Sequence, residues 1–169
     1  MTVLGHAFLN HYKWIDVAKI LGCHSIRVNA FGSSDDPNAL HASAVASLST
    51  LAAYAAPMGI NVIVENHGGF SSDGMWLSHV MKDINMPNCG TLPDFGNFCI
   101  KHGVDPNGAN ICVEEYDKYR GVQQLLNFAK GVSAKSYDFD DAGNETTIDF
   151  KRMIDLVKTS KYKGYIGIE

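Results

Sequence analysis

Three acidic residues of this chain follow short apolar runs that are typical of β-strands. Glu65 ends the run NVIVE, Asp94 follows TLP, and Glu169 ends GYIGIE. Carboxylates that converge in one pocket repel one another unless protons or a cation neutralise them. If the three meet in the fold, a divalent metal ion is the simplest way to keep them charged, because carboxylate oxygens are good ligands for Mg²⁺ and Mn²⁺.

Other polar residues lie near the same strand ends, and together with such an ion they suggest a site for a polar substrate. These residues are Arg27, Asn29, His67, Asn97 and Lys135. Each alone is compatible with an ordinary surface loop, but acids at the ends of three strands, with Asn and His beside them, favour a site. A bound metal can acidify a sugar C–H beside a carbonyl, and a carboxylate can then move the proton.

Predicted strands alternate with predicted helices along the whole chain. We expect strands at Ser25–Asn29, Asn61–Glu65 and Val132–Ser136, and two more that end near Asp94 and at Glu169. Alternating strands and helices of this length indicate βαβ units and a parallel sheet. The carboxyl ends of parallel strands meet at one edge, which is where such folds bind ligands.

The composition is that of one globular domain, which we place at residues 1–169, since 46% of the residues are hydrophobic. A net charge of −4 without a Lys/Arg cluster argues against a nucleic-acid partner. We find no apolar run of the roughly 18 residues that span a bilayer, and the amino terminus lacks the pattern of a signal peptide. We therefore expect neither a nucleic-acid nor a membrane partner, and a cytoplasmic location.

The four cysteines show no C-x-x-C spacing. A chain of this length does not depend on disulfides for its core. We expect Cys23, Cys89, Cys99 and Cys112 to be reduced thiols in packing roles.

Several segments, taken in order, resemble one known superfamily over nearly the whole chain. They are HYKWIDVAKILGCHSIRVN, VIVENHGG, LPDFGNF, VSAKSYDFDDAGNETTIDFKRMIDLVK and GYIGIE. They are similar to the xylose isomerase-like sugar phosphate isomerases and epimerases, a superfamily that also contains endonuclease IV and the ketose 3-epimerases. The resemblance implies a (β/α)8 TIM barrel with metal and substrate at the carboxyl ends of the later strands.

The resemblance also implies roles for individual residues. Glu65, Asp94 and Glu169 match the acids of the fifth, sixth and eighth barrel strands, which are metal ligands, and the first and last are also the acid/base pair. His67 and Asn97 match positions that contact substrate. We assign substrate binding to Arg27 and Asn29 as well.

The seventh strand departs from the family pattern. Many relatives read HVKD there and supply a histidine ligand, whereas this chain reads VSAKS, with Ser133 at the histidine position and Lys135 at the lysine position. The site then has three protein ligands plus water, or it also recruits His67. We expect Mn²⁺, with Mg²⁺, Co²⁺ and Zn²⁺ as alternatives.

A second departure concerns the number of strands. If Ser25–Asn29 is the fourth barrel strand, about strands 4 to 8 are present, so the TIM-barrel-like fold is incomplete. Such a sheet has two open edges and an uncovered inner face, which is unfavourable for a soluble monomer. Either the chain is a truncated product or gene fragment, or association covers the opening, and we expect a homo-oligomer.

The favoured function is isomerisation or epimerisation of a small carbohydrate, either a sugar or a sugar phosphate. One of Glu65 and Glu169 removes a proton beside a carbonyl, the metal and Lys135 stabilise the enediolate, and the other carboxylate returns a proton. The alternative is a non-catalytic barrel fragment or binding module. Phosphodiester cleavage of the endonuclease IV type is a third hypothesis, disfavoured by the acidic charge.

Overall fold

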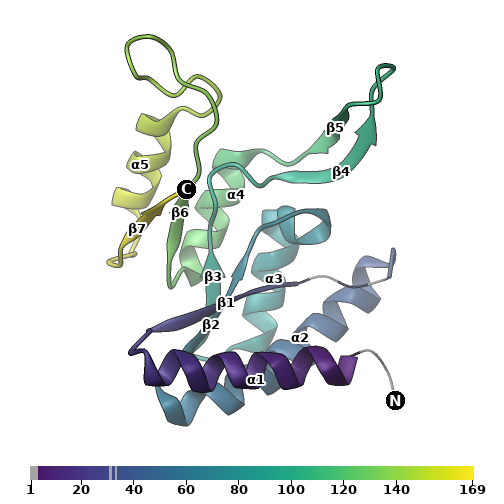
Figure 1. The fold of residues 1–169 in the computed structure, drawn as a ribbon, viewed down its shortest axis with the longest axis vertical. Coiled ribbons are helices and arrows are strands. Elements are labelled where there is room, and N and C mark those ends of the chain that lie inside the picture. Colours follow the sequence, from purple (N-terminus) through teal and green to yellow (C-terminus); the bar gives the residue numbers. More distant parts are fainter. Residues whose placement is uncertain (1–3, 31, 33) are drawn as a thin grey trace.

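The computed structural model describes residues 4–30, 32 and 34–169 (Figure 1). Helices and strands alternate along most of the chain, except where two strands follow one another in a hairpin. In chain order the elements are α1 (Leu4–Ile20), β1 (Ser25–Asn29), α2 (Pro37–Ala55), η1 (Ala56–Met58), β2 (Asn61–Glu65), η2 (Gly69–Ser72), α3 (Gly74–Ile84), β3 (Cys89–Leu92), β4 (Cys99–Val104), β5 (Asn110–Glu115), α4 (Lys118–Leu125), η3 (Leu126–Phe128), β6 (Val132–Ala134), α5 (Phe150–Thr159) and β7 (Ile166–Ile168).

Strands β1, β2 and β3 form a parallel sheet with β2 in the middle. Glu65 is paired with Asn29 on one side and with Leu92 on the other. Val62 and Val64 pack into the core beneath the helices, and Glu65 takes the opposite face because successive strand residues alternate. The bounds predicted for β1 and β2 are confirmed.

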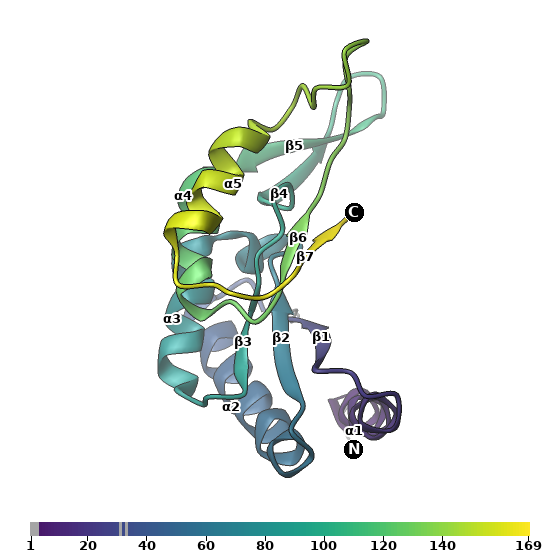
Figure 2. The same ribbon diagram turned by 90° about the vertical axis from the view of Figure 1, so that its left-hand side faces the viewer.

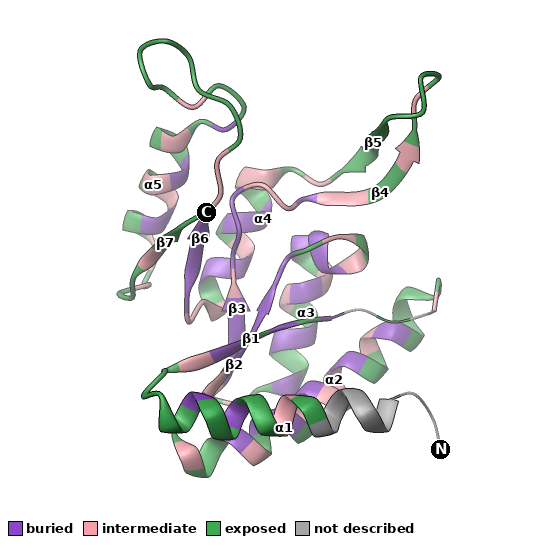
Figure 3. Cartoon of the chain, viewed as in Figure 1, coloured by how far each residue is buried: buried purple, intermediate pink, exposed green. Residues whose placement is uncertain are grey.

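The helices that cover this sheet begin at side-chain caps. The Asp36 carboxylate accepts a hydrogen bond from Asn38 N–H at 2.9 Å at the start of α2, and the Asp73 carboxylate accepts one from Met75 N–H at 2.8 Å at the start of α3. Gly59, with a φ of 72°, ends the helical segment directly before β2. The buried faces of these helices lie against the buried strands (Figure 3).

The segment Pro37–Met58, which is α2 with η1, is long and apolar enough to cross a membrane by length and composition. The expectation that no segment passes this test is therefore wrong. In the fold, Leu48, Leu51 and Ala52 of this segment are buried in the hydrophobic core beside the sheet. This side of the segment therefore packs against the central sheet, and the lack of a membrane partner stays a prediction.

Strands β6 and β7 form a second parallel pair. Two isolated parallel bridges, Thr91 with Ala129 and Asp94 with Ser133, connect β6 to the β3 side. The parallel strands therefore follow one another in the order β1, β2, β3, β6, β7, and in the described part of the chain they do not close into a ring. This arrangement confirms the expected incomplete barrel.

The two faces of this strand array differ. Helices α2, α3, α4 and α5 lie on one side of the strands, while α1 lies beside β1 at the edge (Figure 2). No described helix covers the other side, which we call the inner face. Arg27 and Asn29 of β1 are exposed, whereas Ile26 and Val28, which alternate with them, are buried.

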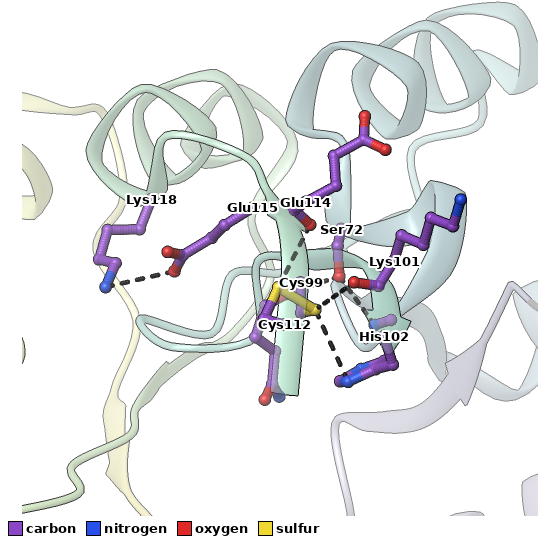
Figure 4. The surroundings of a disulfide bond; sticks show 10 residues. Ser72, Cys99, Lys101, His102, Cys112, Glu114, Glu115 and Lys118 are labelled. Atoms are coloured by element: carbon purple, nitrogen blue, oxygen red, sulfur yellow. Dashed lines mark hydrogen bonds and ion pairs between the residues drawn. A yellow bond between two sulfur atoms is a disulfide. The ribbon is translucent and has the colours of Figure 1, made fainter. Parts of the chain in front are cut away.

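An antiparallel hairpin of β4 and β5 projects between β3 and α4, and the sequence analysis did not predict it (Figure 1). A disulfide between Cys99 and Cys112 joins its strands (Figure 4). The expectation of reduced thiols is wrong for these two residues, because antiparallel pairing brings together cysteines 13 positions apart. Cys23 and Cys89 are free thiols.

Candidate metal centre

Three carboxylates meet at the carboxyl ends of three parallel strands. Glu65 is the last residue of β2, Asp94 follows β3, and Glu169 follows β7. One oxygen of each lies within 4.8 Å of those of the other two. Glu65 and Asp94 are buried, whereas the Glu169 side chain is 51% exposed. The structure thus brings together the acids that the sequence places at separate strand ends.

Glu65 has one charged and one neutral partner. Arg27 of β1 forms an ion pair with Glu65 Oε2, and Asn97 Nδ2 donates to Glu65 Oε1 at 3.2 Å. Two of the residues predicted to bind substrate therefore contact the carboxylate cluster directly. Asn29 lies two positions beyond Arg27 on β1 and is exposed.

Asn66 holds the turn that presents Asp94, a role the sequence analysis did not assign. Its Oδ1 accepts from Asp94 N–H at 2.7 Å, and its Nδ2 donates to the carbonyls of Asp94 and Asn97, both at 3.1 Å. Asn66 is fully buried, so these bonds link the end of β2 to the segment after β3. The only signal in the sequence is its place between Glu65 and His67.

The Asp94 carboxylate is only half satisfied. Its Oδ1 accepts from the N–H groups of Gly96 at 2.8 Å and Asn97 at 2.9 Å, whereas its buried Oδ2 has no hydrogen-bond partner. Burial raises the pKa of Asp94 above the ordinary 3.8, against the opposing effects of these N–H groups and of the Lys135 charge. A buried polar atom without a partner costs about 1–3 kcal/mol, so this oxygen favours a bound cation or proton.

Glu169 is held by two residues of the segment VSAKS, which includes β6. Ser133 Oγ donates to Glu169 Oε2 at 3.0 Å, and Lys135 Nζ donates to Oε1 at 2.5 Å. The Lys135 ammonium keeps the pKa of Glu169 below the ordinary 4.5, with help from Ser133 and against partial desolvation. The same pair raises the pKa of Lys135.

His67 does not belong to the carboxylate cluster. It lines a neighbouring cleft of about 240 Å³ together with Asn97, His102 and Tyr137. Among the described residues, the group that could hold an ion contains carboxylates and no imidazole. The cleft adjoins the cluster through Asn97, which contacts both.

These residues fit a divalent cation. The donors are carboxylate oxygens, which are hard ligands suited to such ions. The unpartnered Asp94 Oδ2 is a second observation in favour, because a cation would satisfy it. The predicted ligands Glu65, Asp94 and Glu169 would together hold it, with Arg27 and Lys135 as the nearby positive charges that limit the net negative charge of the cluster.

Comparison with known proteins gives one family match. The model of a family described as xylose isomerase-like TIM barrel matches residues 6–169. None of the curated proteins matches the chain by sequence.

Similar solved structures share the fold at low identity. A D-allulose 3-epimerase from Methylomonas sp. has a TM-score of 0.75 and 20% identity over 99% of this chain and 57% of its own. A xylose isomerase-like TIM barrel protein from Mycobacterium smegmatis in complex with magnesium has a TM-score of 0.69 and 19% identity over 96% and 59%. The IOLI protein with a bound zinc atom has a TM-score of 0.70 and 14% identity over 100% and 62%. The chain therefore spans less than two thirds of each.

Proposed function

This chain belongs to the xylose isomerase-like TIM barrel family, and on that premise we propose that it binds a divalent cation and isomerises or epimerises a small carbohydrate. The expected family and fold class are confirmed, whereas the reaction is our inference. The observation that carries it is the convergence of three carboxylates within 4.8 Å around a buried oxygen without a partner.

Glu65, Asp94 and Glu169 are the proposed ligands, and Mn²⁺ is the ion that we expect. When bound, such an ion neutralises the carboxylates and draws electron density from adjoining substrate oxygens. Structural relatives in complex with magnesium and with zinc support divalent binding without identifying the ion.

We propose that two of the carboxylates move protons. Glu65 and Glu169 approach the same space from different strands, and each is paired with a cation, Arg27 or Lys135. We propose that one takes a proton from the carbon beside the substrate carbonyl and that the other returns a proton. We propose that the Lys135 ammonium stabilises the negative oxygen of the enediolate once its bond to Glu169 is exchanged for one to the substrate.

The substrate contacts are proposed for Arg27, Asn29, His67 and Asn97. Arg27 and Asn29 lie on the open inner face, and His67 and Asn97 line the adjoining cleft. Amide, imidazole and guanidinium groups can all donate to sugar hydroxyls. An epimerase relative in complex with D-allulose supports a sugar as substrate, and a phosphate group on it stays a prediction.

A non-catalytic cation-binding module is the second candidate. The same three carboxylates could hold an ion without any reaction following, so the cation site alone also fits this role. Phosphodiester cleavage is less favoured because the net charge is −4. We keep the proposals that the chain has neither nucleic-acid nor membrane partners and that it is cytoplasmic.

Solvent proton exchange separates the two candidates. The chain is incubated with a panel of ketoses and ketose phosphates in D₂O, with Mn²⁺ or with chelator, and deuterium at substrate carbon is measured by NMR. We expect Mn²⁺-dependent labelling that disappears in Glu65→Gln and persists in Asp155→Asn, whose carboxylate is exposed on α5. Cation binding without labelling of any substrate would favour the binding module.

A further inference from the structure

Ser133 lies between the buried and the exposed acids of the cluster. Its N–H donates to the Pro93 carbonyl at 2.9 Å, and its own carbonyl accepts from Phe95 N–H at 3.1 Å. Its hydroxyl donates to Glu169 Oε2 at 3.0 Å, and the residue is only 8% exposed. Ser133 is therefore fixed by its backbone on the Asp94 side and by its side chain on the Glu169 side.

The single hydroxyl proton cannot serve both acids. A serine hydroxyl donates one hydrogen bond, and the contact of 3.0 Å assigns that proton to Glu169. Asp94 Oδ2 remains buried without a partner. This unpartnered oxygen is independent of the clustering of acids, and it points to a cation beside Ser133.

The atoms of this cluster that could bind a metal ion are all oxygens. His67 and His102 line the neighbouring cleft, and Cys89 of β3 packs in the hydrophobic core. Within the part of the chain that the structure describes, no nitrogen or sulfur ligand belongs to the cluster. Carboxylates and hydroxyls suit Mg²⁺ and Mn²⁺, whereas imidazole and thiolate strengthen the binding of Zn²⁺ and Co²⁺.

We propose that Ser133 determines the cation selectivity of this site. By placing a neutral oxygen where an imidazole or thiolate could bind, it keeps the site oxygen-only and reduces the advantage of Zn²⁺ and Co²⁺ over Mg²⁺ and Mn²⁺. It also positions Glu169, the one exposed ligand. This inference rests on the proposed cation site and specifies the class of ion that the site accepts.

The sharpest test is Ser133→Cys, which changes oxygen to sulfur with little change in shape. It is made in a Cys23→Ser background so that the exposed free thiol does not compete. Titration calorimetry without substrate compares Mg²⁺, Mn²⁺, Co²⁺ and Zn²⁺. We expect Zn²⁺ and Co²⁺ affinity to rise by on the order of 10- to 100-fold, with far smaller changes for Mg²⁺. The Co²⁺ complex should gain a sulfur-to-metal charge-transfer absorption.

Three further variants make the result specific. Ser133→Ala removes the bond to Glu169 without adding a ligand, so it should weaken all four ions by a similar factor. Ser133→His supplies an imidazole and serves as the second selectivity variant, and thermal melts in chelator establish that each variant is folded. Adding Asp94→Asn to Ser133→Cys should abolish the gain, which places the new ligand in this cluster.

The outcomes separate this inference from the proposed function. An unchanged ratio of Zn²⁺ to Mg²⁺ affinity in folded Ser133→Cys and Ser133→His would overturn the role of Ser133 while leaving the cation site in place. If the Cys23→Ser parent binds none of the four ions, the proposed cation site itself is refuted, together with the inference built on it.

Discussion

Strands β2 and β7 both deliver a glutamate to the same cluster, but they hold it in different ways. β2 is paired on both sides, and its last four residues are buried. β7 is paired only with β6 among the described strands, and its Ile168 is 93% exposed. Glu65 at the end of β2 is buried, whereas Glu169 after β7 is about half exposed.

The difference shows two ways to position a carboxylate. Glu65 is placed by the packing of its strand, since Val62 and Val64 are locked in the core. In β7 only the partly buried Ile166 packs against a core, and the carboxylate of Glu169 is held by Ser133 and Lys135. The central sheet therefore provides a rigid half of the site, and the β6–β7 pair provides a half that depends on polar contacts.

The largest expected effect concerns the two open edges, because burial of apolar surface contributes about 25 cal/mol per Å². Trp14 and Leu21 are exposed beside β1, and Tyr165 and Ile168 are exposed at β7. We predict that the chain self-associates through these edges, or is poorly folded alone. Light scattering during size-exclusion chromatography tests this, and a monodisperse monomer with a sharp cooperative melt would contradict it.

The next prediction compares the interiors of the two halves. Leu77→Ala, in the core beneath the central sheet, should cost about 2–5 kcal/mol of unfolding free energy. Ile168→Ala on β7 should cost at most about 0.5 kcal/mol in the monomer, because that side chain is already in water. Urea denaturation measures both, and equal losses would remove the distinction between the halves.

Cation binding should depend more on the buried acids Glu65 and Asp94 than on the exposed Glu169. An ion at about 100 times its Kd stabilises the folded state by about 2.7 kcal/mol. We predict that Mn²⁺ raises the melting temperature of the wild type, that Glu65→Gln and Asp94→Asn abolish the shift, and that Glu169→Gln retains part of it. Differential scanning fluorimetry with matched chelator samples measures this, and a full shift in Glu65→Gln would count against the site.

Without a bound metal ion, the unpartnered Oδ2 of Asp94 should lower the stability of the wild type. In chelator at neutral pH, Asp94→Asn should be more stable than the wild type by up to about 1–3 kcal/mol, because it removes an unpartnered buried charge. The pKa of Asp94 is raised, so the folded state binds its proton more tightly. Wild-type stability from this group should therefore fall as pH rises through that pKa.

The stability that Glu169 contributes should change with pH in the opposite direction. Its pKa is lowered, so its stabilising contribution is present above the ordinary 4.5 and is lost as pH falls through the lowered value. Urea denaturation of the wild type, Asp94→Asn and Glu169→Gln at a series of pH values separates the stability contribution of Asp94 from that of Glu169. A wild type and Asp94→Asn with parallel pH profiles would contradict the assignment to Asp94.

The smallest predicted effect concerns the β4–β5 hairpin. Because β5 is exposed along its whole length, reduction of Cys99–Cys112 should free the hairpin locally. The loss of global stability should stay well below the ~3 kcal/mol expected for a loop of about 15 residues, while proteolysis within residues 99–115 accelerates. Cys99→Ser/Cys112→Ser is the matched variant, and a large drop in melting temperature would contradict local opening.

The same disulfide bears on location. Disulfides persist mainly in oxidising compartments, which contrasts with the predicted cytoplasmic location. Alkylation of the protein in its source cells, followed by mass spectrometry of the hairpin peptide, measures the redox state directly.

The sequence by itself determined the alternation of strands and helices, the bounds of β1 and β2, and the presence of acids at the strand ends. These features are local: β-branched runs such as NVIVE favour strands, and alternation along a strand decides which side chains share a face. That is why the sequence could place Glu65 beside a core-facing strand and expect it at the ligand-binding edge.

The tertiary structure alone decided which groups meet. The pairing of Cys99 with Cys112, the bonds of Asn66 to the Asp94 turn, and the single proton of Ser133 given to Glu169 all join segments far apart in the chain or across a hairpin. Burial of Asp94 likewise depends on packing that no local pattern encodes. The sequence therefore identified the acids, and only the fold decided which of their oxygens lacks a partner.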